Sequence, residues 1–258
     1  MQEWISLGRG PLFRLAFSLM VLGSLRLVLV QLLGAAEAYR RNPDRIVAWR
    51  EVIRQTFAWM VPLGRLWEQR PVYSTISILF HVGLIGTPLL LAAHILLWQR
   101  SVGLSWPAMP QVWADRLTLL TIGTGLALLL IRLLDAPTRA LSGPQDYGWL
   151  VLLVTPSVTG YVCANAPVGP KTYHLMMLIH VYAGDLIMAL IPFSKIAHCA
   201  LAPLSQTVSA LAWKFVPGAG DKIIATLGRA GMPSYVATGR AQTAAGTVAV
   251  TGEEFCSR

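Results

Sequence analysis

The chain is poor in charged residues. Only 13% of its 258 residues are charged, while 55% are hydrophobic. An ordinary soluble domain carries about twice that share of charge, so the composition excludes that class. Several apolar runs are also long enough to cross a bilayer, which indicates an integral membrane protein built from helices.

Cysteine is scarce as well, and no cysteine motif is present. The three cysteines, Cys163, Cys199 and Cys256, form neither a C-x-x-C nor a C-x-x-C-H pattern. Covalently attached c-type haem and an iron–sulfur cluster held by this chain are therefore not expected. The odd number also argues against a disulfide framework, so we expect small buried or surface thiols.

Acidic residues are few, which leaves a strongly basic chain. Twelve Asp and Glu stand against 21 Lys and Arg, giving a net charge of +9. The basic residues cluster between the apolar runs. This pattern is typical of membrane topology signals and of contact with anionic lipid, and it does not indicate nucleic acid as a partner.

The apolar runs predict an all-α fold, an integral membrane bundle of five transmembrane helices. The expected spans are 11–39, 73–99, 112–134, 145–165 and 172–200. The first run is too long and too interrupted by arginine for a signal peptide, so we expect it to be retained. The basic loops after the first and third spans predict an N-terminus outside and a C-terminus in the cytoplasm.

These spans define a membrane domain at 1–203 and a cytoplasmic tail at 204–258. The basic segment at about 40–71 has the spacing of an amphipathic helix that lies on the inner surface. It would serve as a docking platform for a partner or as a lipid-anchored connector. The tail would contact a cytoplasmic subunit or adopt loose, extended structure.

Four histidines lie within the apolar runs, where an imidazole is costly and usually functional. His180 and His198 are eighteen residues apart, or five helical turns, so their rings face the same way about 27 Å apart along the axis. His81 and His94 lie on an earlier span. On the predicted topology, His81 matches His198 toward the inner face, and His94 matches His180 toward the outer face. Two imidazoles at each of two depths are suitable axial ligands for two stacked b haems.

The spacing on the second span requires a local distortion. His81 and His94 are thirteen residues apart, so their directions differ by roughly 140° on an ideal helix. Pro88 lies between them, and a kink there could bring both rings to the haem side. Pro192 lies between the other two histidines, so their alignment is approximate. His174, six residues before His180, is an alternative outer ligand.

Three further polar residues are candidates for the site. Haem propionates need basic partners, and Arg132 and Lys195 are candidates at the inner side. Asp185 lies in the fifth span, where a carboxylate is expensive. It could orient a ligand imidazole, take part in a proton path, or occupy a water-exposed position near a bundle cavity.

Two segments resemble the gamma subunit of respiratory nitrate reductase. One runs from His180 to His198, with Ile-Pro-Phe-Ser-Lys at 191–195, and the other is Phe-His-Val-Gly at 80–83. Other motifs are similar to a wider set of dihaem cytochrome b subunits of membrane redox complexes in anaerobes. Those motifs are Thr-Pro at 87–88, Ala-His-Ile-Leu-Leu-Trp at 93–98 and Asp-Arg-Leu-Thr at 115–118. The resemblance covers about residues 73–200.

The resemblance implies two b haems held by His81, His94, His180 and His198 in the inner membrane. It also implies quinone chemistry, with menaquinone or a similar quinone, near the outer haem. The expected function is a membrane-anchor cytochrome b that passes electrons between quinone and a cytoplasmic iron–sulfur subunit of a respiratory complex. Two alternatives remain open: transfer from a periplasmic multihaem cytochrome c to quinone, and a haem-free membrane scaffold.

Overall fold

The computed structural model describes residues 1–41, 49–60 and 70–215, and all regular elements within these ranges are helices. The predicted all-α class is thus confirmed for the described part of the chain. The elements are α1 (Gln2–Leu7), the π-helical turn η1 (Gly8–Leu12), α2 (Phe13–Arg41), α3 (Trp49–Met60), α5 (Pro71–Leu90), α6 (Ala92–Val102), α7 (Gln111–Leu134), α8 (Ala136–Ala140), α9 (Pro144–Asn165), α10 (Pro170–Leu190), the short 3₁₀ turns η2 (Ile191–Phe193) and η3 (Lys195–Ala197), and α11 (His198–Phe215).

Five helical segments of the described chain are long and apolar enough to cross a membrane. They are Gln2–Arg40, Pro71–Leu90, Gln111–Leu134, Pro144–Asn165 and Pro170–Phe193. This finding supports the predicted multi-pass membrane protein with five spans. The side of the membrane on which each terminus lies stays a prediction.

The first span begins earlier than predicted. We expected it to begin at 11, but helical structure begins at Gln2 and passes through the π-helical turn η1. Pro11 lies inside this turn. Proline lacks an amide hydrogen, and a single π-helical turn is a common way to accommodate an irregularity in a helix.

The second and fifth predicted spans are each interrupted, which corrects the sequence prediction of continuous helices. Helix α5 ends at Leu90, Leu91 has an extended backbone (φ −73°, ψ 128°), and α6 then begins. Helix α10 ends at Leu190, and Ser194 is extended (φ −134°, ψ 178°) between η2 and η3. Pro88 lies inside α5, three residues before Leu91, and Pro192 lies in η2, between the end of α10 and Ser194. Each proline lacks the amide hydrogen that a regular helix would use at its position.

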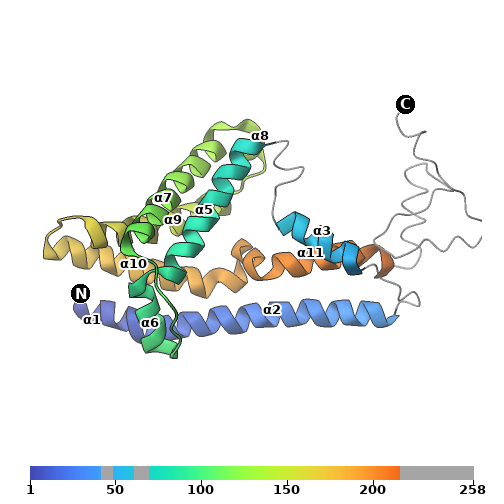
Figure 1. Cartoon of the computed structure of the whole chain (residues 1–258), viewed down its shortest axis with the longest axis horizontal. Coiled ribbons are helices and arrows are strands. Elements are labelled where there is room, and N and C mark those ends of the chain that lie inside the picture. Colours follow the sequence, from blue (N-terminus) through green and yellow to red (C-terminus); the bar gives the residue numbers. More distant parts are fainter. Residues whose placement is uncertain (42–48, 61–69, 216–258) are drawn as a thin grey trace, which may run out of the picture. The chain divides into compact units, whose positions relative to one another are not determined.

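Helices α5, α7, α9 and α10 pack in a row, each on the next in sequence (Figure 1). Phe80, Leu128 and Leu150 form the core of the first three. Glycines permit close approach, as in other membrane bundles. A Cβ atom at Gly83 would overlap the Thr121 hydroxyl of α7, and one at Gly125 would lie 2.5 Å from Val154 of α9.

The described chain divides into two compact units. Among the described residues, the first comprises 1–28 and 70–201 and contains His81, His94, His180 and His198, and the second comprises 29–41, 49–60 and 202–215. The sequence prediction placed 29–60 in the membrane domain and began a tail at 204. Helix α11 runs from His198 to Phe215 and thus spans the predicted boundary, which stays a prediction. Residues 42–48, 61–69 and 216–258, which belong to the predicted basic segment and tail, lie outside the described residues.

Helix α3 is the described part of the predicted amphipathic segment. Val52 and Thr56 are buried, and the Thr56 hydroxyl lies 3.2 Å from that of Thr207 on α11. Trp49, Ile53 and Phe57 are exposed at successive four-residue intervals. This spacing gives one apolar stripe along the helix, as expected for an amphipathic helix.

Candidate functional site

The structure brings His81, His94, His180 and His198 together as two pairs. The ring centroids of His81 and His198 lie 6.2 Å apart, and those of His94 and His180 lie 5.8 Å apart. The planes of the first pair are inclined by 77°, and those of the second pair by 11°. These are the partners that the predicted topology matched by depth. Their role as ligands stays a prediction.

Each pair combines one histidine inside a continuous helix with one that closely follows a helix break. His81 lies within α5 and His180 within α10. His94 and His198 each lie six residues after a proline, Pro88 or Pro192 respectively. This shared proline–histidine spacing is a signal that the sequence analysis missed, and it places the second histidine of each element beyond the break.

The break at Leu91 frees backbone carbonyls, and the following loop uses them. The Trp106 indole donates a hydrogen bond to the carbonyl of Leu89 (2.6 Å), and the amide of Met109 donates to that of Leu90 (2.9 Å). The loop therefore satisfies carbonyl groups that would otherwise lack partners, which stabilises the break. The change of direction at Leu91 replaces the simple kink at Pro88 that the sequence suggested.

Aromatic contacts hold α6 against the N-terminal helix. The Trp98 ring packs edge-on against Phe13 and Phe17, with centroids 5.8 and 5.0 Å apart, and lies 6.0 Å from Trp106. Such edge-to-face pairs contribute about 0.5–1.5 kcal/mol each beyond simple burial. This cluster fixes the helix that carries His94.

Three of the four imidazoles donate from Nδ1 to a backbone carbonyl. The acceptor is Ser77 for His81 (2.7 Å), Pro156 for His180 (2.8 Å) and Lys195 for His198 (2.8 Å). A carbonyl can only accept, so Nδ1 carries the proton and Nε2 keeps its lone pair for a metal. Nε2 of His198 also has a long contact, 3.9 Å, with the Cys199 thiol.

His94 differs from the other three because its Nδ1 atom is buried with no hydrogen-bond partner among the described residues. The carbonyl groups of Thr87 and Pro88 are close enough to interact with this ring. A buried nitrogen without a partner is unfavourable by about 1–3 kcal/mol. A bound ligand or a small local adjustment would give this Nδ1 atom the hydrogen-bond partner that it lacks.

Gly160 allows the ring of His180 to approach α9. A Cβ atom at this position would lie 2.7 Å from Cε1 and 2.9 Å from Nδ1 of His180. Any side chain at 160 would therefore displace the ring. His174, the alternative outer ligand, instead lies with its ring 5.9 Å from that of Tyr173; His180 is the histidine that faces His94.

The predicted propionate partners have protein partners of their own. Arg132 donates to the hydroxyl of Ser142 (2.9 Å). Lys195 forms an ion pair with both carboxylate oxygens of Asp146, at 2.8 and 3.0 Å. The structure thus assigns Lys195 a contact that the sequence did not predict.

A second polar network lies at the start of α8. Arg70 donates to the carboxylate of Asp135 (3.2 Å) and to the hydroxyl of Thr138 (2.9 Å). Hydrogen bonds from the Thr138 hydroxyl and amide, with a smaller contribution from Arg70, hold the pKa of Asp135 below its usual range. Among the described residues, their side chains form hydrogen bonds with one another and not with a histidine, so they provide a matched reference for the Asp146–Lys195 pair.

Two further polar residues, Arg9 and Asp185, lie within the first and fifth apolar spans. Arg9, on η1, places a guanidinium nitrogen 2.9 Å from the sulfur of Met177, and its charge acts on His180. Asp185 is only 5% exposed, and its Oδ2 atom has no partner among the described residues. The alternative of a water-exposed Asp185 is therefore wrong. Arg9 was missed because the sequence analysis began the first helix after it.

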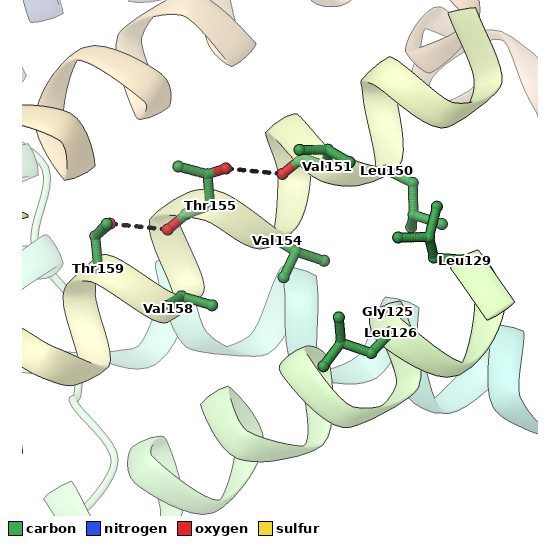
Figure 2. A pocket seen from close by; sticks show the side chains of 9 residues that line it. All are labelled: Gly125, Leu126, Leu129, Leu150, Val151, Val154, Thr155, Val158 and Thr159. Atoms are coloured by element: carbon green, nitrogen blue, oxygen red, sulfur yellow. Dashed lines mark hydrogen bonds between the residues drawn. The ribbon is translucent and has the colours of Figure 1, made fainter. Parts of the chain in front are cut away.

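Two apolar surface pockets occur in the first of the two compact units. A pocket of about 390 Å³ is lined by Trp4, Leu178, Ile179 and Tyr182, next in sequence to His180. Another, of about 240 Å³, lies between α7 and α9 (Figure 2). In the second, the hydroxyls of Thr155 and Thr159 donate to carbonyls of their own helix, so neither hydroxyl hydrogen remains for a ligand.

Comparison with known proteins identifies one relative. No protein-family model matches the chain, and no solved structure matches it. A curated protein of Nitratidesulfovibrio vulgaris strain Hildenborough, named only "Protein", is 33% identical over 168 residues. The match covers 64% of this chain and 72% of the relative. The chain therefore belongs to the same family as this Nitratidesulfovibrio vulgaris protein, whose name assigns no function.

Proposed function

We propose that the chain is a dihaem cytochrome b that anchors a multisubunit respiratory redox complex in the cytoplasmic membrane. The observation that carries this proposal is the meeting of four histidines as two pairs of rings 5.8 and 6.2 Å apart. The proposed family is that of the nitrate reductase gamma subunit and its relatives. On the predicted orientation, the His81–His198 pair is inner and the His94–His180 pair is outer.

The ring separations fit two ligands on opposite sides of one iron. Two metal–imidazole bonds of about 2 Å place the ligating nitrogens about 4 Å apart, so the ring centres lie about 6 Å apart. Within the described residues, no group of three His, Cys, Asp or Glu side chains could hold a bare metal ion. Pairs of imidazoles are therefore suited to a metal whose other ligands come from a porphyrin.

The hydrogen bonds of the rings also fit this role. A ligating imidazole usually donates its other N–H to a carbonyl or carboxylate, which fixes the ring and raises its basicity. His81, His180 and His198 do so. For His94, coordination through Nδ1, or donation from Nδ1 to a carbonyl with coordination through Nε2, would satisfy the buried atom.

The arrangement supports electron transfer rather than oxygen chemistry. Bound b haem supplies reversible one-electron chemistry. Each haem would be held by two imidazoles of this chain, which would leave no place for an exogenous ligand. His81, His94 and His180 are partly buried among apolar helices, which would limit the access of water to these rings. His94 follows the C-terminal end of α5, and His198 follows the C-terminal end of α10. On the predicted topology these two spans run in opposite directions, so the two pairs would lie at different depths and the chain would carry electrons across the membrane.

The partners follow from the same proposal. A quinone, menaquinone or similar, would react near the His94–His180 pair, and an iron–sulfur subunit would receive or supply electrons at the cytoplasmic face. Transfer from a periplasmic multihaem cytochrome c to quinone is the alternative route through the same two pairs. Co-purification of a cytoplasmic iron–sulfur subunit or of a periplasmic cytochrome would separate the two.

The proposal predicts a visible spectrum. Protein purified in detergent should show a reduced-minus-oxidised α-band of b haem, with two haems per chain by extraction. A haem-free scaffold would show neither. Absence of the band from protein that elutes as a single folded species would overturn the proposed function.

We predict that quinol is oxidised at the pocket lined by Trp4 and Ile179. Its volume of about 390 Å³ and apolar lining suit a small hydrophobic ligand, and its lining residue Ile179 is the neighbour of His180 in sequence. Ile179→Trp should fill the pocket and slow reduction of the haems by a menaquinol analogue about tenfold or more, while haem content stays at two per chain.

A matched variant controls for bulk on the lipid-facing surface. Val158→Trp fills the other pocket, between α7 and α9 (Figure 2), and should leave the reduction rate unchanged. Equal rates in wild type and Ile179→Trp would place the quinone elsewhere.

A further inference from the structure

We propose that the Asp146–Lys195 ion pair positions the imidazole of His198, so that Lys195 is a positioning residue and not a partner of a haem propionate. This inference rests on the proposed function, since it concerns how one ligand is held. It assigns a role to Asp146, which the sequence analysis did not consider.

The contacts form a continuous chain from α9 to the ring. Nδ1 of His198 donates to the carbonyl of Lys195 (2.8 Å). The ammonium of the same Lys195 donates to Oδ1 and Oδ2 of Asp146, at 2.8 and 3.0 Å. One residue therefore accepts the ring's hydrogen bond with its backbone and anchors that backbone with its side chain.

The backbone before His198 needs such an anchor. His81 and His180 lie inside long helices, but His198 follows two 3₁₀ turns that are separated by the extended residue Ser194. Its local support consists of short-range hydrogen bonds: the Ser194 hydroxyl accepts from the amide of Ile196 at 3.3 Å, and the Ser194 carbonyl accepts from the amide of Ala197 at 3.0 Å. Short 3₁₀ turns have poor hydrogen-bond geometry, so they do not fix the direction of the ring by themselves.

Asp146 is a firm attachment point. It lies in the first turn of α9, where its Oδ2 atom also accepts from the amide of Gly143 (2.9 Å). Its side chain is 15% exposed, whereas that of Lys195 is 61% exposed. The start of α9 thus holds the Asp146 carboxylate in place. The ion pair with this fixed carboxylate orders the longer and more exposed side chain of Lys195.

The expected chemical consequence is a change in ligand strength. A hydrogen bond from Nδ1–H to a fixed carbonyl raises the basicity of the imidazole, which favours ferric iron. When the anchor is removed, the ring loosens and the bond weakens. The potential of the haem held by His198 should therefore rise, and reduced haem should become able to bind carbon monoxide.

Two single variants of the full chain distinguish positioning from simple electrostatics. Lys195→Gln removes a positive charge and Asp146→Asn a negative one, so electrostatics alone would lower and raise the haem potential respectively. Positioning predicts that both variants raise the potential of the same haem and make it reactive toward carbon monoxide. The double variant should equal the stronger single one, because both changes break one connection. The measurements are redox titration and the carbon monoxide difference spectrum.

Two further variants complete the test. Lys195→Arg keeps a bidentate ion pair and should retain the wild-type potential. Asp135→Asn removes a carboxylate paired with Arg70 and should leave carbon monoxide reactivity absent. Opposite shifts in the two single variants, or no reactivity toward carbon monoxide, would overturn the positioning role. Wild-type protein without b haem would instead overturn the proposed function itself.

Discussion

Replacing His198 by alanine should reduce the haem content from two per chain to one. His198 and His81 are the two rings of one pair, with ring centroids 6.2 Å apart. Without His198, this haem would be held by His81 alone, and we expect it to be lost during purification. The other pair, His94 and His180, is held by separate contacts. The variant should still insert, because His198 lies outside the apolar span that ends at Phe193. Haem extraction with protein quantification measures the ratio.

Companion variants define the pairing. His81→Ala should lose the same haem, and the His81→Ala/His198→Ala double variant should still retain one. His174→Ala should keep both, because its ring contacts Tyr173 and not His94. Two haems in His198→Ala, or a double variant with none, would contradict the pairing of His81 with His198.

The sequence was sufficient to predict the features that depend on composition and on the position of a residue along its span. Runs of apolar residues specify spans because each must cover a hydrocarbon core of fixed thickness. The alternating direction of successive spans then matches His81 with His198 and His94 with His180 without any knowledge of packing. Length and direction are properties of one chain, so a sequence reveals them.

The sequence was insufficient where contacts between distant segments decide the outcome. Pro88 and Pro192 indicated distortion, but the exact breaks at Leu91 and Ser194 depend on partners for the freed backbone groups. At Leu91 these partners come from the loop before α7. The argument from five whole turns between His180 and His198 was wrong for the same reason, since no single helix joins them.

The roles of small and charged residues also depended on tertiary structure. Lys195 was a plausible propionate partner by depth alone, but the partner it contacts, Asp146, lies 49 positions away in sequence. Gly160 carried no signal, since a glycine in an apolar span has many explanations. Its proximity to His180 appears only when α9 and α10 pack together.

Gly160→Val should remove the haem held by the His94–His180 pair and leave the other in place. The first side-chain carbon would lie 2.7 Å from Cε1 of His180, well inside van der Waals contact, so the ring must move. Movement also breaks the hydrogen bond from Nδ1 to the carbonyl of Pro156. Overpacking of this kind costs about 1–3 kcal/mol, which the bundle can tolerate while one ligand is misplaced.

Gly148→Val is the matched control. Gly148 lies on the same helix as Gly160, and a Cβ atom at position 148 would meet nothing within 4 Å. That variant should keep two haems per chain with a wild-type spectrum. Combining Gly160→Val with His198→Ala should leave no haem, since each change removes a different one. Retention of both haems in Gly160→Val would show that His180 is not a ligand, because the ring cannot keep its present position beside a valine.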